Sequence, residues 1–166
     1  MSDGAPLELR HWTPPTRRVE DETNQGRYTP RGLVLELAIR HGRGAFDLDV
    51  AATAASAVAP RWYTKEENGI LRPWIGRVFC NPPWNDIAPW VKKAKESILI
   101  GTAEVVVMVL PARFGTMWFA SLEQTAEIER VYGRVSYLTP DGRELRSPFE
   151  HTVIAVLRRP LRAEDC

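Results

Sequence analysis

An asparagine, two prolines and a tryptophan end a short apolar run in the stretch "RVFCNPPW", residues 77–84. Each proline fixes its own φ angle and lacks an N–H, so the carbonyls of Asn81 and Pro82 are held in place without a competing neighbouring donor. The Asn81 side chain adds another acceptor, and Trp84 adds a flat aromatic face. These groups predict a site that accepts both hydrogens of an NH2 group on a planar ring or an amide.

The elements around this motif place it at the edge of a sheet. Residues 77–80 form a strand candidate, and a helix is predicted after the prolines because Ile87, Val91 and Ala94 recur at helical spacing. Asp86 is the predicted cap of this helix. In open α/β sheets ligands bind outside the carboxyl ends of the strands, so the motif lies where a binding site is expected.

A second helix is predicted near the start of the ordered chain, in "TPRGLVLELAIRHG". Thr29 is its predicted N-cap and Pro30 its first helical residue, and Gly42 ends it. Leu37 and Ala38 belong to the apolar face of this helix. The pattern therefore predicts an amphipathic helix ahead of the first strand.

The remaining segments alternate in a way that is typical of an α/β fold. Residues 45–51 form a short strand candidate, and the valine-rich run 103–110 predicts a strand buried on both faces at the centre of a sheet. A short helix at 117–122 precedes consecutive strands, which include a Pro-Asp-Gly turn at 140–142 and a last strand at 151–157. This order predicts a mostly parallel sheet with an antiparallel C-terminal hairpin.

Length and composition favour a single domain. The chain has 166 residues, and 44% of them are hydrophobic, enough for one core. Residues 1–26 lack apolar periodicity and are interpreted as a flexible leader, so the domain is assigned to residues 27–160 and residues 161–166 to a tail. The formal net charge of +1 neither indicates nor excludes a polyanionic partner.

The cysteine content and the apolar segments bear on the compartment. The two cysteines, Cys80 and Cys166, favour a reducing cytoplasm, and no disulfide is expected. No stretch reads as a signal peptide or as a membrane span. We therefore expect a cytoplasmic protein, in a bacterium or in a phage-infected host cell, with no membrane association and no metal site.

Further segments accompany the proline motif, between about Tyr28 and Leu157. With these segments the chain resembles the amino-group methyltransferases that use S-adenosylmethionine and carry an Asp/Asn/Ser-Pro-Pro-aromatic motif. More narrowly, it resembles the small phage-type DNA N6-adenine methyltransferases. The resemblance implies an abridged Rossmann-like methyltransferase sheet. It rests on the segments "YTPRGL", "FDLDVAA", "WYTKEENGI", "GRVFCNPPW", "PWVKKA", "WF", "YGRVSYLTPDG" and "SPFEHTVIAVL".

For the substrate, the resemblance implies double-stranded DNA with an adenine flipped out of the helix. Asn81 and the carbonyl of Pro82 would accept hydrogen bonds from the N6 amine, Pro83 would hold the turn, and Trp84 would stack on the base. Such a site needs no strong base, because it holds the amine so that the nitrogen lone pair points at the methyl group. The rate of methyl transfer would then depend on this geometry and not on proton abstraction.

For the cofactor, the resemblance implies S-adenosylmethionine held by two parts of the chain. Thr29 and Pro30 would lie near its amino-acid end, and Asp49, Val50 and Ala51 would form a corner at the end of the first strand. A plain structural role is the alternative at two of these places. In this alternative Asp49 is a helix cap or part of a loop salt bridge, and Thr29 with Pro30 only starts a helix.

The chain departs from the family pattern in places. Asn68 lies where the family tends to have an acidic residue that reads the adenine amino group, and Trp84 replaces the commoner tyrosine. The loop "DVAATAAS" has alanines where glycines are usual. The stretch of sequence between Asp49 and Asn81 is too short for two full βα units. Glu66 and Glu67 are weak candidates for a ribose-binding acid.

Other interpretations remain open. An enzyme of this type can act on cytosine N4, on adenine in RNA or on a glutamine amide, and a catalytically silent nucleic-acid-binding relative would keep the same fold. The oligomeric state is open between a monomer and a homodimer. "HWTPP" at 11–15 is interpreted as a chance copy of the motif, and Trp118 with Phe119 as core. Arg113, Arg143 and Arg146 are candidate phosphate contacts.

Overall fold

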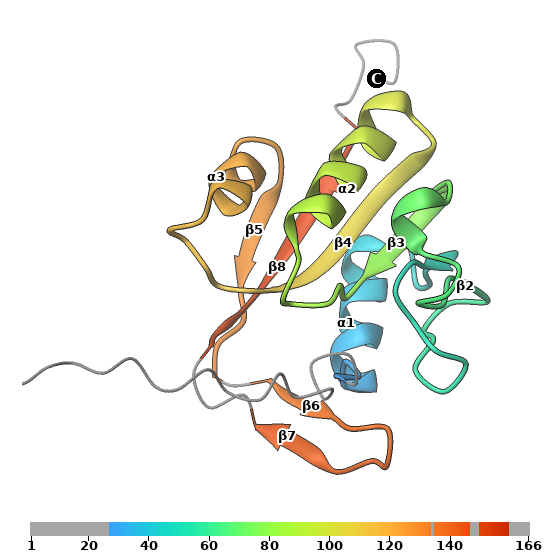
Figure 1. Cartoon of the computed structure of the whole chain (residues 1–166), viewed down its shortest axis with the longest axis vertical. Helices are drawn as coiled ribbons and strands as arrows, with labels where there is room; N and C mark the ends of the chain where they lie inside the picture. Colours follow the sequence, from blue (N-terminus) through green and yellow to red (C-terminus); the bar gives the residue numbers. More distant parts are fainter. Residues whose placement is uncertain (1–26, 134, 147–149, 160–166) are drawn as a thin grey trace, which may run out of the picture.

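A six-stranded sheet forms the centre of the molecule in a computed structural model that describes residues 27–133, 135–146 and 150–159. The leader, the motif-like stretch at 11–15 and the tail lie outside the described residues. The sheet has the order β2-β1-β3-β4-β8-β5 (Figure 1). Its strands are β1 (Leu48–Asp49), β2 (Arg61–Trp62), β3 (Gly76–Cys80), β4 (Ala103–Pro111), β5 (Glu127–Arg130) and β8 (Thr152–Arg158).

The direction of the strands confirms the predicted fold class. β1 pairs in parallel with both β2 and β3, and β3 pairs in parallel with β4. β8 is antiparallel to both of its neighbours, β4 and β5. All strands of this sheet except β8 therefore run in one direction, which is consistent with a Rossmann-like methyltransferase fold.

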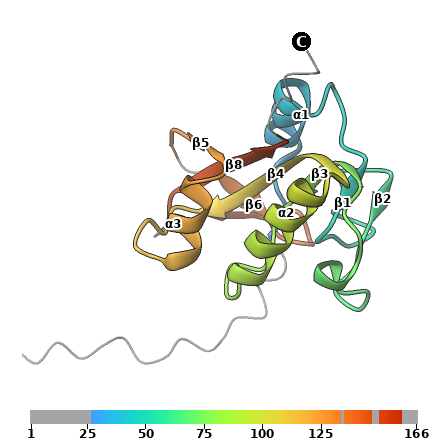
Figure 2. The ribbon, with the colours of Figure 1, turned by 90° about the horizontal axis from the view of Figure 1, so that it is seen from above.

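Helices cover both faces of the sheet. Seen from above in Figure 2, α1 (Arg31–His41) lies on one side, and α2 (Ala88–Ile100) and α3 (Met117–Glu123) lie on the other. The predicted apolar face of α1 is confirmed, because Val34, Leu37 and Ala38 are buried. Coverage of both faces explains why the central strands are almost entirely apolar.

The core is centred on β4, as the sequence predicted. Seven consecutive residues from Val105 to Pro111 are buried in this strand, which pairs with β3 on one side and β8 on the other. Phe119 of α3 is fully buried against the same core, and Trp118 is partly buried beside it. Their interpretation as core residues is confirmed.

A small hairpin stands apart from the main sheet. β6 (Ser136–Leu138) and β7 (Glu144–Arg146) form a two-stranded antiparallel sheet that projects below the main sheet in Figure 1. The backbone of Tyr28 pairs with that of Leu138, so the segment before α1 runs along this hairpin. The side chain of Tyr137 is buried.

The sheet is abridged on the side of β1 and β2. The parallel strands β1 and β2 are joined by residues 50–60 without a helix, and the chain between β2 and β3 forms only the short 3-10 helix η2 (Gly69–Leu71). The predicted strand at 45–51 is assigned to Leu48–Asp49, although hydrogen bonds to β3 extend from Asp47 to Val50. β2 was not predicted, because its two residues are exposed at the sheet edge and carry no alternating pattern.

Two predicted helix starts were wrong. α1 begins at Arg31 with Pro30 in the N-cap position, because the Thr29 hydroxyl is engaged with Asn81 instead of an α1 amide. α2 begins after Ile87 without a side-chain cap, and Asp86 belongs to the preceding turn, where its N–H donates to the carbonyl of Pro83. Both differences arise from contacts of the proline motif.

No helix in residues 27–133, 135–146 and 150–159 is long and apolar enough to cross a membrane.

Candidate active site

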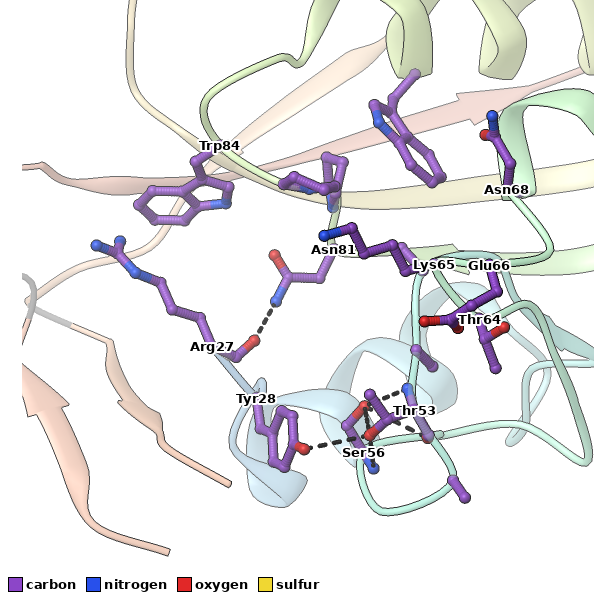
Figure 3. A pocket seen from close by; sticks show the side chains of 17 residues that line it. Arg27, Tyr28, Thr53, Ser56, Thr64, Lys65, Glu66, Asn68, Asn81 and Trp84 are labelled. Carbon is purple, nitrogen blue, oxygen red and sulfur yellow. Dashed lines mark hydrogen bonds between the residues drawn. The ribbon is translucent and has the colours of Figure 1, made fainter. Parts of the chain in front are cut away.

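A pocket of about 760 Å³ opens beside the carboxyl ends of β1 and β3. Five segments of the chain contribute to it, and Figure 3 shows their side chains around one space. Its volume lies within the range of about 300–1,000 Å³ that is usual for small-molecule sites. The lining residues are Arg27, Tyr28, Ala51, Ala52, Thr53, Ala54, Ser56, Thr64, Lys65, Glu66, Asn68, Gly69, Asn81, Pro82, Pro83, Trp84 and Trp90.

The amide of Asn81 is held in one orientation. Its Nδ2 donates to the backbone oxygen of Arg27 at 3.0 Å and to Oγ1 of Thr29 at 3.1 Å. A backbone carbonyl only accepts, so the atom that faces Arg27 must be the nitrogen. Because both amide hydrogens are used, Oδ1 is left as an acceptor, and Figure 3 shows it directed into the space below Trp84.

The two prolines continue this acceptor surface. Neither residue has an N–H, and no donor within the described part of the chain is bonded to the carbonyl oxygen of Pro82. The next carbonyl, that of Pro83, accepts from the N–H of Asp86 at 3.3 Å and closes the turn into α2. One side-chain oxygen and one backbone oxygen are thus available at the end of β3.

Trp84 forms a wall of the pocket although its side chain is only 3% exposed. The edge-to-face contact with Tyr137 has ring centroids 5.3 Å apart and an interplanar angle of 86°. The Arg27 guanidinium lies over the indole ring, with Cζ 4.8 Å from the ring centroid. The indole N–H is buried and has no hydrogen-bond partner within the described residues, so it is a donor that a ligand can satisfy.

Arg113 supports this wall from outside. Its Nη1 donates to the backbone oxygen of Trp84 at 2.7 Å, and its Nε and Nη2 bind the carboxylate of Glu150 at 2.9 and 3.1 Å. These bonds engage the Arg113 guanidinium in positioning the backbone at Trp84, instead of leaving it free for the predicted phosphate contact. Arg143 pairs with Asp141 in the exposed hairpin loop, and the side chain of Arg146 lies outside the described part of the structure.

The corner after β1 has a different construction. The Asp49 carboxylate is 3% exposed and accepts from the N–H of Ala51 at 3.3 Å and from that of Val58 at 3.2 Å. Burial raises the pKa of Asp49 to about 7, and the two backbone bonds oppose this shift. The side chain therefore holds the loop 51–58 from inside.

Next to this loop, the backbone approaches itself very closely at Gly69. A Cβ atom on Gly69 would lie 2.1 Å from the carbonyl oxygen of Val50, so only glycine fits there. The Gly69 carbonyl accepts from Nε1 of buried Trp74 at 2.8 Å. Asn68, in the left-handed region with φ of 53°, caps η2 by accepting from the N–H of Ile70. These contacts fix the far wall of the pocket.

The structure brings six of the ten sequence-predicted site residues to the pocket and leaves four away from its lining. Ala51, Asn68 and the four residues Asn81–Trp84 line it. Thr29 is buried and contacts Asn81, and Asp49 and Val50 are buried behind the loop. The lining does not include Pro30, which precedes α1.

Sequence reasoning missed several lining residues from other segments. The Tyr28 hydroxyl lies 3.2 Å from that of Thr53, which in turn is 3.1 Å from the hydroxyl of Ser56, so these residues join two walls. Lys65 also lines the pocket, and so does Glu66, one of the two weak acidic candidates. The other, Glu67, accepts from the backbone N–H of Thr64. In the sequence, most of these residues were marked only as parts of the family-like segments "YTPRGL" and "WYTKEENGI", without a role in the site.

Comparison with known proteins identifies the family of the chain. A model of the family described as DNA N-6-adenine-methyltransferase (Dam) matches residues 17–166. The chain belongs to this family. A DNA N-6-adenine-methyltransferase of Escherichia phage T1 is 36% identical over 101 residues, which are 59% of this chain.

The match spans 40% of the length of that phage T1 protein. No solved structure matches the chain. Membership of the Dam family rests on the family model, which covers both corners of the pocket, the one after β1 and the one after β3.

Proposed function

We propose that the protein transfers a methyl group from S-adenosylmethionine to the N6 amine of adenine in double-stranded DNA. Membership of the Dam family supports the reaction class. The observation that carries the proposal is the fixed amide of Asn81, whose two hydrogens are bonded to Arg27 and Thr29 while its oxygen is directed into the pocket.

In the base half of the pocket, three groups act on the substrate. The Asn81 side-chain oxygen and the Pro82 carbonyl oxygen accept the two hydrogens of the amine, and the Trp84 ring supports the plane of the base. Adenine reaches such a pocket only after it leaves the base stack. Because the acceptors are fixed before binding, the amine nitrogen is held with its lone pair free, and the proton is lost during or after the transfer.

In the cofactor half, the walls fit S-adenosylmethionine. The small side chains of Ala51, Ala52 and Ala54 leave room beside β1, and Asn68 adds polar groups at the far wall. When bound, this cofactor supplies a methyl group on a positively charged sulfur. Thr29 and Asp49 would act indirectly, Thr29 by orienting Asn81 and Asp49 by holding the loop 51–58.

A transfer assay tests the proposal. The full chain is incubated with methyl-labelled S-adenosylmethionine and mixed-sequence double-stranded DNA, and the DNA is digested to nucleosides. We expect label in N6-methyladenine. As a matched control, DNA synthesised with N6-methyladenine in place of adenine should accept much less label.

The same digest separates the alternative substrates. Label in N4-methylcytosine would change the acceptor base, and label transferred only to RNA or to a protein amide would change the class of substrate. Absence of both cofactor binding and transfer would indicate a silent nucleic-acid-binding relative. DNA as partner also implies action in the cytoplasm of a bacterial or phage-infected cell.

A further inference from the structure

The side chain of Arg27 occupies the place where the proposed function puts the target base. Its guanidinium carbon lies 4.8 Å from the centroid of the Trp84 ring, within the distance of a cation–π contact. Tyr137 packs against the same indole ring in a T-shaped contact. A planar, weakly hydrated guanidinium is well suited to cover an aromatic face, so Arg27 fills the position that a stacked base would need.

The backbone of Arg27 is fixed while its side chain is not. The Arg27 carbonyl accepts from Nδ2 of Asn81, and the next residue, Tyr28, exchanges two backbone hydrogen bonds with Leu138 at 2.8 and 3.0 Å. No carboxylate in the described part of the chain is paired with the Arg27 guanidinium. Rotation of one side chain therefore uncovers Trp84 without any change in the orientation of Asn81.

We propose that Arg27 is a displaceable plug of the base pocket, whose guanidinium covers Trp84 in the absence of substrate and leaves when the target base stacks there. This inference rests on the proposed function, because it assigns Trp84 to the base. The backbone and the side chain of Arg27 then have separate roles. The backbone orients the Asn81 acceptor, and the side chain sets the threshold for entry.

The plug lowers the affinity of the pocket for every base that stacks on Trp84. Base binding must replace the cation–π contact, so the apparent affinity is reduced by the fraction of molecules in which Arg27 covers Trp84. A base that both stacks and donates two hydrogens, to Asn81 and Pro82, makes up for this loss. This factor is the same for every base, so Arg27 raises the threshold for entry and leaves the ratio of affinities between two bases unchanged.

Binding of the nucleoside alone tests the plug without DNA or turnover. The full chain is saturated with S-adenosylhomocysteine, which fills the cofactor half and carries no transferable methyl group. 2′-Deoxyadenosine is then titrated calorimetrically into wild type, Arg27→Ala and Arg27→Gln. A cation–π contact of this kind predicts affinity about 2- to 30-fold tighter in Arg27→Ala. Arg27→Gln, which keeps a polar side chain but is shorter and loses the charge, should also bind more tightly than wild type.

Arg143→Ala is the matched control, because it removes an exposed arginine that pairs with Asp141 and does not line the pocket. Its affinity for the nucleoside should equal that of wild type. Equal or weaker binding by Arg27→Ala, including no binding at all, would overturn the plug. The S-adenosylhomocysteine titration of each variant shows that it is folded. Failure of wild type to bind S-adenosylhomocysteine or to methylate DNA would instead overturn the proposed function.

Discussion

The corners after β1 and after β3 open into one pocket but are fixed by different means. The corner after β3, residues 81–84, is stiffened by its own prolines and by a segment more than 50 residues earlier in the chain, through the bonds from Asn81 to Arg27 and Thr29. The corner after β1, residues 49–58, is held by the carboxylate of Asp49, which bonds the backbone of its own loop.

The two polar residues at these strand ends therefore have opposite orientations. Asn81 is half-buried and directs an oxygen into the pocket, whereas Asp49 is 3% exposed and turns towards the protein. Both residues lie at the carboxyl ends of strands, and these strands, β1 and β3, are parallel neighbours in the sheet. One corner therefore offers an acceptor to a ligand, and the other only supports the wall.

Removal of the ligand-facing acceptor should have the largest effect. Asn81→Ala deletes the oxygen that the proposed function assigns to the N6 amine. We expect kcat for DNA methylation to fall about 10²- to 10³-fold, as for the loss of one preorganised polar group at a reaction centre. Affinity for S-adenosylmethionine, measured calorimetrically, should be unchanged, because the cofactor half is intact.

Asn85→Ala is the control for this prediction. Asn85 is the same residue type only four positions later, but it is exposed and does not line the pocket. Its kcat should match that of wild type. Comparable activity of the Asn81 and Asn85 variants would mean that the corner after β3 is not the substrate corner.

The supporting role of Asp49 predicts a pH dependence. Burial raises the pKa of Asp49 from its ordinary 3.8 to about 7 in the folded chain. Between these pH values the folded state keeps a proton that the unfolded state has lost, so the contribution of Asp49 to stability falls as pH rises. The fall is at most about 1.4 kcal/mol per pH unit and ends above the folded pKa.

Asp49→Asn isolates this contribution, because it removes the titrating group. The stability of wild type minus that of the variant, from urea unfolding at several pH values, should decrease from about pH 4 to about pH 7 and then stay level. A difference that rises with pH would show that the carboxylate is stabilised by its bonds to Ala51 and Val58 more than it is penalised by burial.

A substitution at Gly69 tests whether the far wall of the pocket depends on the close approach of the Gly69 and Val50 backbones. A methyl group at Gly69 would lie 2.1 Å from the Val50 carbonyl oxygen, so Gly69→Ala forces η2 away from the end of β1. Overpacking of this kind costs about 1–3 kcal/mol of unfolding free energy. Affinity for S-adenosylmethionine should also fall, because Gly69 and Asn68 both line the pocket.

Gly32→Ala is the paired control in α1, where an added Cβ meets nothing within 4 Å. It should stabilise the helix by about 0.5–1 kcal/mol, since alanine restricts the unfolded chain. If both glycine variants unfolded at the same denaturant concentration, the contact between Gly69 and Val50 would not be essential to the fold.

The sequence was most informative where the chain fixes its own geometry. The valine run at 103–110 and the proline motif at 81–84 depend on local properties, and both were located correctly. β2 was missed because two exposed residues carry no period, and the start of α1 was misplaced because a distant asparagine binds the Thr29 hydroxyl. The lining by Arg27 and Lys65 depends on tertiary structure, so no local pattern predicted it.

The smallest predicted effect concerns the remote support of Asn81. Thr29→Val keeps the shape of the side chain but removes the oxygen that accepts from Nδ2 at 3.1 Å, while the bond to the Arg27 carbonyl at 3.0 Å remains. One neutral hydrogen bond is worth about 0.5–1.5 kcal/mol, so kcat should fall about 2- to 13-fold. The Asn81 amide keeps its orientation, because an acceptor-only carbonyl still faces its nitrogen.

The family resemblance assigns Thr29 to the cofactor, and the same variant separates that role from the support of Asn81. A cofactor contact would raise KM for S-adenosylmethionine, whereas loss of support would lower kcat and leave that KM unchanged. Thr29→Ser, which retains the hydroxyl, should restore kcat. A rise in KM for S-adenosylmethionine with constant kcat would move Thr29 back to the cofactor half and leave the orientation of Asn81 to Arg27 alone.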